Sequence, residues 1–157
     1  KENANVFVCD INSKNIDLIN DNNFIVVDPE NIYDDNYDII SPCALGGTIN
    51  KNSLKNINCD IIAGAANNQL ENDTDVPEEL LKKNILYIPD FLINAGGIIS
   101  VYHEQINDID SKKVMDMTGL IYDKVSSVIK YSEENSISTN SSAIQLAKDR
   151  IKENSKK

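Results

Sequence analysis

The sequence predicts an α/β fold built on a mostly parallel sheet, and three observations carry this prediction. Short, continuous apolar runs recur through the first half of the chain. Asp, Asn, Gly or Pro residues bound each run, as is usual at the ends of strands. Segments with helical spacing separate the runs, and strands that alternate with helices form parallel sheets with both faces covered.

The expected strands and helices follow one another along the chain. Strands are expected at residues 5–10, 24–27, 37–41, 60–64 and 85–89. Helices are expected between them at residues 13–20, 50–57 and 76–84. A serine in a capping position opens the first helix, and Pro77 lies near the first turn of the third, where proline is tolerated.

After the last expected strand, helical spacing takes over. Apolar residues recur at intervals of three and four from Val114 to Ile129, which predicts one long amphipathic helix. Polar residues end it, and a last helix begins near Thr139 or Asn140. The apolar face of this last helix is expected to consist of Ile144, Ala147 and Ile151.

Length and composition fit one soluble globular domain. The chain has 157 residues, of which 41% are hydrophobic and 25% charged, so it is long enough to bury a sizeable core. We expect a sheet-bearing part at residues 1–107 and a helical extension of the same domain at residues 108–157. The formal net charge of −10 argues against nucleic acid or an anionic membrane as a partner, because both bind basic surfaces.

The sequence also indicates a reducing, cytoplasmic compartment. Cys9, Cys43 and Cys59 are odd in number and form no C-x-x-C motif, so we expect reduced thiols that are buried as small hydrophobic residues. No apolar run approaches the roughly 20 residues that a membrane span needs. The opening segment "KENANVFVCD" lacks the long apolar core of a signal peptide.

The turns that follow the strands are the candidate ligand-binding segments, because ligands of open parallel sheets bind beyond the carboxyl ends of the strands. These segments are Asp10, "SPCALGG" at residues 41–47, "GAANNQL" at residues 64–70 and "PDFLINAGG" at residues 89–97. Alanines and glycines crowd the three longer ones, and small side chains let a backbone approach a flat ligand closely. Gly96 and Gly97 stand at a helix start, although a glycine costs a helix interior roughly 0.8–1 kcal/mol relative to alanine.

Asp10 has two interpretations. An acid at the end of a strand is where a dinucleotide-binding fold holds the ribose hydroxyls, and Asp is also a common helix cap. Ile11 follows it, and no Arg stands there to bind a 2′-phosphate, which favours NAD over NADP. The fingerprint G-x-G-x-x-G is absent from the sequence. Either the fold is a different one, or the chain begins inside a domain.

Other polar groups also have competing interpretations. His103-Glu104 lacks the second histidine of the zinc motif H-E-x-x-H, so a polar helix position is favoured over a metal site. The cysteines lack metal-binding spacing as well, and no metal is predicted. Asn67 and Asn68 follow an expected strand among small residues, where a plain polar turn and a ligand-binding turn fit the sequence equally.

Three segments taken together, "SPCALGGTIN", "IIAGAANNQL" and "IPDFLINAGGIISVYHE", resemble the coenzyme domain of the leucine, phenylalanine and valine dehydrogenases. These enzymes belong to the amino-acid dehydrogenase superfamily that includes glutamate dehydrogenase, and the leucine dehydrogenases are the most similar branch. The resemblance covers nearly the whole chain. It implies a Rossmann-like sheet that lacks its first strand and glycine-rich loop. It also implies NAD-dependent oxidative deamination of a branched or apolar L-amino acid to the 2-oxo acid and ammonium.

The resemblance further implies roles for single residues. Its coenzyme-binding residues would be Asp10, Ile11, Pro42, Cys43, Ala44, Ala66, Asn67 and Asn94. Its substrate-binding residues would be Asn67, Ile98 and Val101. Gly96 and Gly97 would let the helix start lie against the nicotinamide ring. The apolar pair Ile98 and Val101 favours an apolar amino acid, whereas a different oxidoreductase of the superfamily would need a charged residue at one of these positions.

The catalytic lysines and aspartate of the family lie in an N-terminal substrate domain, and no residue of this chain corresponds to them. We therefore expect this chain to be the C-terminal part of a longer enzyme. On its own it should be catalytically silent, bind NAD weakly and tend to associate. The full-length form is expected to be a homo-oligomer. The alternative is a non-catalytic, degenerate dinucleotide-binding or assembly module.

Overall fold

The computed structural model describes residues 3–19, 24–108 and 110–155. The strands are β1 (Val6–Val8), β2 (Phe24–Val26), β3 (Asn36–Ile40), β4 (Asn58–Ile62) and β5 (Leu86–Tyr87). The first helices are α1 (Ser13–Asp17), the 3-10 turn η1 (Ser53–Lys55), α2 (Asp75–Lys82) and α3 (Asp90–Ile93). The later helices are α4 (Gly96–Gln105), α5 (Ser111–Gly119), α6 (Ile121–Asn135) and α7 (Thr139–Asn154).

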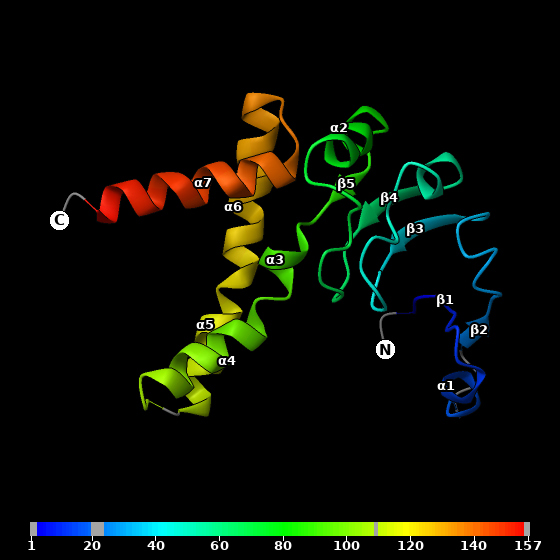
Figure 1. Ribbon diagram of the computed structural model, residues 1–157, viewed down its shortest axis with the longest axis horizontal. Helices are drawn as coiled ribbons and strands as arrows, with labels where there is room; N and C mark the ends of the chain where they lie inside the picture. Colours follow the sequence, from blue (N-terminus) through cyan, green and yellow to red (C-terminus); the bar gives the residue numbers. More distant parts are fainter. Residues whose placement is uncertain (1–2, 20–23, 109, 156–157) are drawn as a thin grey trace.

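These elements form a sheet layer and a helical layer (Figure 1). The strands and α2 lie on one side, α4 to α7 lie on the other, and α3 lies between them. The expected division of the domain at residue 107 falls between α4 and α5, inside the helical layer. Helix α3 therefore carries the chain from the sheet into the helices.

All neighbouring strands run parallel. β1 pairs with β2 in one sheet, and β3, β4 and β5 form a second sheet in that order. Side chains join the two sheets, because the Phe7 ring of β1 packs edge-on against the Tyr37 ring of β3 with 5.3 Å between their centroids. The predicted α/β class and parallel pairing are confirmed.

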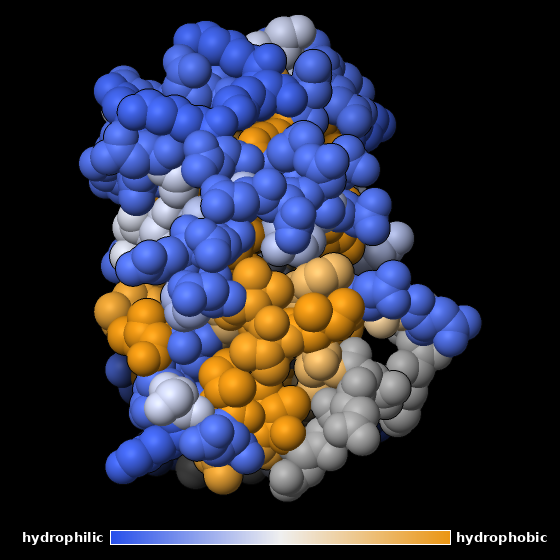
Figure 2. All heavy atoms as spheres, turned by 90° about the vertical axis from the view of Figure 1, so that its right-hand side faces the viewer, coloured by the Kyte–Doolittle hydropathy of each residue, from blue (hydrophilic) through white to orange (hydrophobic). Residues whose placement is uncertain are grey.

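The expectation that both faces of the sheet are covered is wrong for β1 and β2. Every residue of β2 is exposed, and Val26 is 54% exposed. Helix α1 has five residues and none of them is buried, so it is too short to cover a sheet face. Figure 2 views this side and shows hydrophobic side chains gathered over its lower half, the height at which β1 and β2 lie in Figure 1. The apolar side chains that these two strands leave exposed are Val6, Phe7, Phe24, Ile25 and Val26.

The helix expected over residues 50–57 shortens to the single turn η1. Asn50 Oδ1 accepts hydrogen bonds from the backbone N–H groups of Asn52 and Ser53, at 2.9 and 3.0 Å. The Ser53 hydroxyl in turn donates to the Asn50 carbonyl oxygen at 3.1 Å. Side chains that bond to their own backbone in this way compete with helix formation.

The single long helix expected over residues 114–129 is instead two helices, α5 and α6. They meet at Leu120, whose N–H donates to the Met117 carbonyl oxygen three residues earlier at 3.1 Å. Gly119 precedes this turn, and glycine is a weak helix former. Apolar residues continue at intervals of three and four across Leu120, so the sequence alone predicts one helix where the structure has two.

Helix α7 begins where it was expected but buries a different face. Its N-cap is Ser138, whose hydroxyl accepts the Ser141 N–H. The buried residues are Thr139, Asn140, Ser142 and Ala143. Of the face predicted from the sequence, Ala147 is exposed and Ile151 is 66% exposed. The Thr139 hydroxyl donates to the Tyr87 carbonyl oxygen and fixes the start of α7 on β5, while its far end projects from the molecule (Figure 1).

The hydrophobic core lies between β3, β4, β5, η1 and α2. Its fully or almost fully buried members include Ile49, Leu54, Ile57, Ile62, Val76 and Leu80. Cys59 belongs to this core, but Cys9 and Cys43 are exposed. The prediction that all the cysteines are small buried residues therefore holds only for Cys59, which lies on a strand, whereas the other two lie in the turns after strands.

The loops that follow β3 and β4 touch at Gly64. A Cβ atom on Gly64 would lie 2.1 Å from the Pro42 carbonyl oxygen and 2.5 Å from the Pro42 nitrogen. These are backbone atoms, so no side-chain rotation relieves the overlap. Only glycine lets the two loops pass this closely.

We predict that Gly64→Ala destabilises the protein by about 1–3 kcal/mol or more, because the added methyl group forces the two loops apart. The change is measured as the free energy of unfolding in urea. Gly119→Ala is the control, since a Cβ there would meet no protein atom within 4 Å. In a helix this control should be neutral or stabilising by up to about 1 kcal/mol. Equal stability of the Gly64→Ala variant and the unaltered protein would show that the loops do not approach as described.

Candidate functional site

The loops after β3 and β4 are joined backbone to backbone. The Ala66 N–H donates to the Pro42 carbonyl oxygen at 3.0 Å, and the Gly47 N–H donates to the Asn68 carbonyl oxygen at 2.8 Å. A Cβ atom on Gly46 would lie 2.8 Å from the same Asn68 oxygen. At Gly46 and Gly64 the small residues therefore let one loop approach the other loop, rather than a ligand.

A cleft of about 890 Å³ lies between the loop after β4 and the segment that holds α3 and the start of α4. One wall is formed by residues 65 and 67–73. The other wall is formed by Tyr87, Asp90, Phe91, Asn94, Ala95, Gly97 and Ile98. Two of the segments proposed from the sequence, residues 64–70 and 89–97, therefore meet in one place.

Two asparagine side chains face each other in this cleft. Asn94 Nδ2 donates to the Ala65 carbonyl oxygen at 3.3 Å and to Asn67 Oδ1 at 2.6 Å. A carbonyl oxygen only accepts, so the bond to Ala65 fixes which end of the Asn94 amide is the donor. Within the described residues, Asn67 Nδ2 and Asn94 Oδ1 make no hydrogen bond. The pair thus leaves one donor group and one acceptor for a ligand, which favours the ligand-binding interpretation of the turn. The next residue, Asn68, has the left-handed φ of 52° that asparagine tolerates.

Gly97 of the glycine pair and the proposed substrate residue Ile98 line the same cleft as the asparagines. A Cβ atom on Gly97 would meet no protein atom within 4 Å, and one on Gly96 would make only an ordinary contact with Thr118. Protein packing therefore does not require glycine at residue 97. Ile98 lines the cleft and is 72% exposed, while Val101, one helical turn later, is 48% exposed and lies outside the cleft wall.

The other proposed coenzyme residues near this edge differ in exposure. Cys43 and Ala44 are exposed in the loop after β3. Pro42 is buried and accepts the hydrogen bond from Ala66. Ala66 is itself 5% exposed and does not line the cleft. The structure therefore places Asn67, Asn94 and Ile98 together in the cleft and leaves these four residues outside it.

Asp10 lies in the other sheet, after β1. Its Oδ1 accepts the Asn12 N–H at 2.8 Å and its Oδ2 accepts from Asn15 Nδ2 at 2.7 Å. The Asn15 bond and then the Asn12 bond hold the pKa of the Asp10 carboxyl below its ordinary value. Asp10 thus stabilises the first turn of α1, and Ile11 beside it is 86% exposed. Binding of a ribose by Asp10 stays a prediction.

A buried polar layer, which was not predicted from the sequence, lies beneath the cleft. Asp90 Oδ2 accepts the backbone N–H of Gln69 at 3.2 Å, and the Tyr87 hydroxyl oxygen accepts the Asp90 N–H at 3.2 Å. Burial raises the pKa of Tyr87 far above its ordinary value. In the sequence, the indication of this buried layer is a polar residue beside apolar ones, namely Gln69 in "NNQL" and Asp90 in "IPDFL".

His103 lies on helix α4, in agreement with the expected helix position, but it is buried in the helical layer with 6% exposure. Its Nδ1 lies 3.2 Å from the Asp108 carbonyl oxygen, and its Nε2 lies 3.1 Å from Met117 Sδ. The His103 ring therefore links α4 to the loop that contains Asp108 and, through Met117, to α5. Throughout the described ranges, no three His, Cys, Asp or Glu side chains gather in a way that could hold a metal ion.

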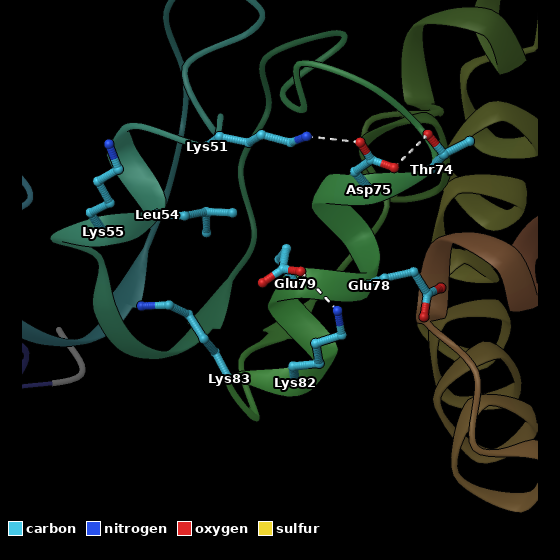
Figure 3. Close-up of a pocket in the computed structure, with 9 residues that line it drawn as sticks. All are labelled: Lys51, Leu54, Lys55, Thr74, Asp75, Glu78, Glu79, Lys82 and Lys83. Atoms are coloured by element: carbon cyan, nitrogen blue, oxygen red, sulfur yellow. Dashed lines mark hydrogen bonds and ion pairs between the residues drawn. The ribbon is translucent and has the colours of Figure 1, made fainter.

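A second groove, of about 610 Å³, lies between η1 and α2 (Figure 3). Its charged residues are Lys51, Lys55, Asp75, Glu78, Glu79, Lys82 and Lys83. Lys51 contacts Asp75 at 2.9 Å and Lys82 contacts Glu79 at 2.8 Å, both as exposed ion pairs. Pairs of this kind contribute little to stability, and no residue proposed from the sequence lines the groove.

Comparison with known sequences identifies relatives over the whole chain. The family model "Glutamate/Leucine/Phenylalanine/Valine dehydrogenase" matches residues 1–157. An L-tryptophan dehydrogenase of Nostoc punctiforme is 46% identical over 126 residues, which are 80% of this chain and 35% of that protein. A leucine dehydrogenase of Bacillus subtilis (strain 168) is 37% identical over 152 residues, which are 96% of this chain and 41% of that protein.

Comparison with solved structures gives a consistent result. The crystal structure of L-tryptophan dehydrogenase from Nostoc punctiforme matches with a TM-score of 0.87 and 40% identity, over 96% of this chain and 46% of that chain. A hetero-hexameric glutamate dehydrogenase from Thermus thermophilus matches with a TM-score of 0.59 and 21% identity, over 74% of this chain and 29% of that chain, which shows the fold alone. The chain spans less than half the length of these relatives. In the part of the chain that the structure describes, no helix has the length and apolar character needed to cross a membrane.

The hydrogen bond that Asn15 donates to Asp10 leads to a prediction about the titration of the Asp10 carboxyl group. Asn15→Ala should raise the pKa of the Asp10 carboxyl toward its ordinary value, because the largest stabilisation of the carboxylate is removed. The contribution of this carboxylate to α1 is present at neutral pH and is lost as the pH falls through its lowered pKa. In the variant, the loss should begin at a higher pH.

The titration is followed by NMR of the Asp10 carboxyl carbon. Ser13→Ala is the control, since Ser13 lies in the same helix and makes no hydrogen bond to Asp10 among the described residues. Superimposable titration curves for Asn15→Ala and the unaltered protein would show that Asn15 does not hold the carboxylate.

Proposed function

Because the chain belongs to the Glutamate/Leucine/Phenylalanine/Valine dehydrogenase family, we propose that it forms the coenzyme-binding part of an NAD-dependent amino-acid dehydrogenase. The reaction is oxidative deamination of an apolar L-amino acid to its 2-oxo acid and ammonium, with water supplying the new oxygen. The observation that carries the proposal is the Asn67–Asn94 pair in a cleft beside Gly97.

The chemistry of this pair fits the nicotinamide end of NAD⁺. A carboxamide presents one carbonyl acceptor and one NH₂ donor. Asn67 Nδ2 and Asn94 Oδ1 supply the matching donor and acceptor, and the Asn94 bond to the Ala65 carbonyl oxygen holds them in that sense. Gly97 adds a backbone surface without a side chain, on which a flat ring can lie. Held by these residues, NAD⁺ would supply a hydride acceptor for the oxidation at the amino-acid α-carbon.

Asp10 is the proposed contact to the ribose at the other end of the coenzyme. Each of its carboxylate oxygens already accepts one hydrogen bond, and a carboxylate oxygen can accept about two. Acceptor capacity therefore remains for a ribose hydroxyl. The exposed neighbour Ile11 offers no positive charge to a 2′-phosphate, which supports NAD as the coenzyme.

The substrate is proposed to have an apolar side chain. Ile98 exposes an aliphatic surface in the cleft, and Val101 continues that surface along α4. The ionisable acids that line the cleft are Glu71, Asp73 and Asp90, and none of the described cleft residues is basic. An acidic side chain would therefore meet like charge without compensation. Relatives named tryptophan, leucine and phenylalanine dehydrogenases agree with an apolar substrate.

The catalytic groups are proposed to lie outside these 157 residues. Asp90 is buried, with 8% exposure, and its two carboxylate oxygens accept the backbone N–H groups of Gln69 and Phe91, while the Tyr87 hydroxyl oxygen accepts the Asp90 N–H. Neither is placed to take a proton from a substrate amine. Assembly of the full-length protein as a homo-oligomer also remains a proposal.

The direct test is amino-acid-dependent formation of NADH. The full-length gene product should reduce NAD⁺ with leucine, phenylalanine or tryptophan, whereas the 157-residue chain alone should not. Loss of a general base by itself slows such reactions by about 10²–10⁴-fold. If the full-length product binds NAD⁺ but oxidises no apolar amino acid, the chain is a non-catalytic dinucleotide-binding module. Turnover by the short chain alone would place the catalytic groups within it.

The substrate surface on α4 is tested separately. Val101→Ala in the full-length gene product should improve the use of bulkier side chains relative to leucine, because it removes two methyl groups from the aliphatic surface that Ile98 and Val101 form on α4. A change of one or two methylene groups alters selectivity by about 10- to 200-fold at most. Selectivity is the ratio of kcat/KM values for tryptophan, phenylalanine and leucine.

Ile151→Ala is the control, since Ile151 is also an exposed aliphatic residue, 66% exposed against 48% for Val101, and lies on α7 rather than on the α4 surface that Ile98 begins. It should leave all the ratios unchanged. A uniform loss of activity in Val101→Ala, without a change in the ratios, would mean that Val101 only packs the helix.

A further inference from the structure

Gln69 is the most completely buried polar side chain near the cleft, with 0% exposure. Its Nε2 donates to the Gly64 carbonyl oxygen at 2.7 Å and to the Ala66 carbonyl oxygen at 2.9 Å. Both acceptors belong to the turn that begins where β4 ends. One side-chain amide therefore closes this turn from the inside.

The backbone of Gln69 is itself held on both sides. Its N–H donates to Asp90 Oδ2 at 3.2 Å, which ties it to the start of α3. Its carbonyl oxygen accepts the Ile49 N–H at 3.0 Å, and Ile49 is a fully buried core residue. The side chain of Gln69 is thus a rigid link between the core and the turn.

The residues that Gln69 Nε2 joins enclose Asn67 in the chain. Gly64 and Ala66 precede Asn67, and Gln69 follows it by two residues. No other hydrogen bond to the Gly64 or Ala66 carbonyl oxygen occurs within the described part of the chain. Without Gln69 Nε2 both oxygens would lie unpaired in a buried site, which is costly enough to change the turn.

We propose that Gln69 is a positioning residue, which holds the turn at residues 64–68 so that the Asn67 side chain faces Asn94 in the cleft. The importance of Gln69 for coenzyme binding rests on the proposed function. The effect of Gln69 on the geometry of the turn is independent of that function, because all of the hydrogen bonds involved lie within this chain.

The surroundings of the other end of the Gln69 amide, the acceptor Oε1, support a specific role for the donor Nε2. Gln69 Oε1 is buried and has no hydrogen-bond partner among the described residues. An unpaired buried oxygen is unfavourable, so an apolar residue of the same length would be preferred if packing alone were required. The two bonds from Nε2 are what an apolar residue cannot replace.

The test compares Gln69→Met with Ser132→Ala in the chain without coenzyme. Gln69→Met keeps the length of the side chain and removes both donors. Ser132→Ala removes a different buried side-chain donor, which bonds to the Ile137 carbonyl oxygen at 2.6 Å in the helical layer. Backbone hydrogen exchange is measured by NMR at Ala66 and Gly47, whose N–H groups hold the turn against the loop after β3. Exchange at Ile88, whose N–H donates to the Ile62 carbonyl oxygen, reports on the sheet.

In Gln69→Met, exchange at Ala66 and Gly47 should become about 10-fold faster or more relative to Ile88. The nuclear Overhauser contact between the Asn67 and Asn94 side-chain amides should weaken. Ser132→Ala should leave the exchange ratio and this contact unchanged. Equal acceleration at all three amides in Gln69→Met would make Gln69 a contributor to global stability only and would overturn the proposal.

A second variant keeps the test decisive if Gln69→Met does not fold. Gln69→Glu retains one O–H donor when the carboxyl is protonated and none when it is ionised. Its Asn67–Asn94 contact should therefore be present at low pH and disappear as the pH rises, whereas the unaltered protein should keep the contact throughout. A contact that does not depend on pH in Gln69→Glu would overturn the proposal. Because no readout involves coenzyme or turnover, failure of the proposed function would leave this result unaffected.

Discussion

The backbone of Gly64 passes so close to Pro42 that a side chain at residue 64 would overlap the Pro42 carbonyl oxygen. This approach brings the ends of β3 and β4 together and allows the Ala66 and Gly47 hydrogen bonds that join their loops. The turn that follows Gly64 can then present Asn67 toward α3, where Asn94 meets it. The cleft is a consequence of this contact, because one of its walls is the turn itself.

The site combines a buried, hydrogen-bonded floor with an exposed surface. Beneath the cleft, Gln69, Asp90 and Tyr87 form buried hydrogen bonds that fix the turn and the start of α3. Above the floor, Asn67 and Ile98 are exposed and carry unused hydrogen-bonding capacity and aliphatic surface. A coenzyme site needs both features, since the donors must be held before the ligand arrives if binding is to avoid the cost of ordering them.

The fold class and two of the segments that line the cleft could be predicted from the sequence, because apolar periodicity and turn residues report on local structure. The strand ends at Ile62 and Tyr87 fell within the expected segments, and the loops after them do form the cleft. The exposed β1–β2 face could not be predicted, since covering a sheet depends on how long α1 is and where it packs. The burial of His103 was also missed, because its contacts come from Asp108 and Met117, which only the turn between α4 and α5 brings to it. For the same reason the sequence did not show that Gly64 serves a neighbouring loop, while Gly97 has open space beside it.

A crystal structure of the full-length gene product with NAD⁺ bound is the direct test of whether the Asn67–Asn94 pair holds the coenzyme. The nicotinamide carboxamide should lie within hydrogen-bonding distance of Asn67 Nδ2 and Asn94 Oδ1, with the ring across the backbone of Gly97. The Asn94 bond to the Ala65 carbonyl oxygen should persist. A nicotinamide bound elsewhere, for instance in the groove between η1 and α2, or an Asn67–Asn94 pair that makes no contact with the coenzyme, would show that this pair is not the nicotinamide site.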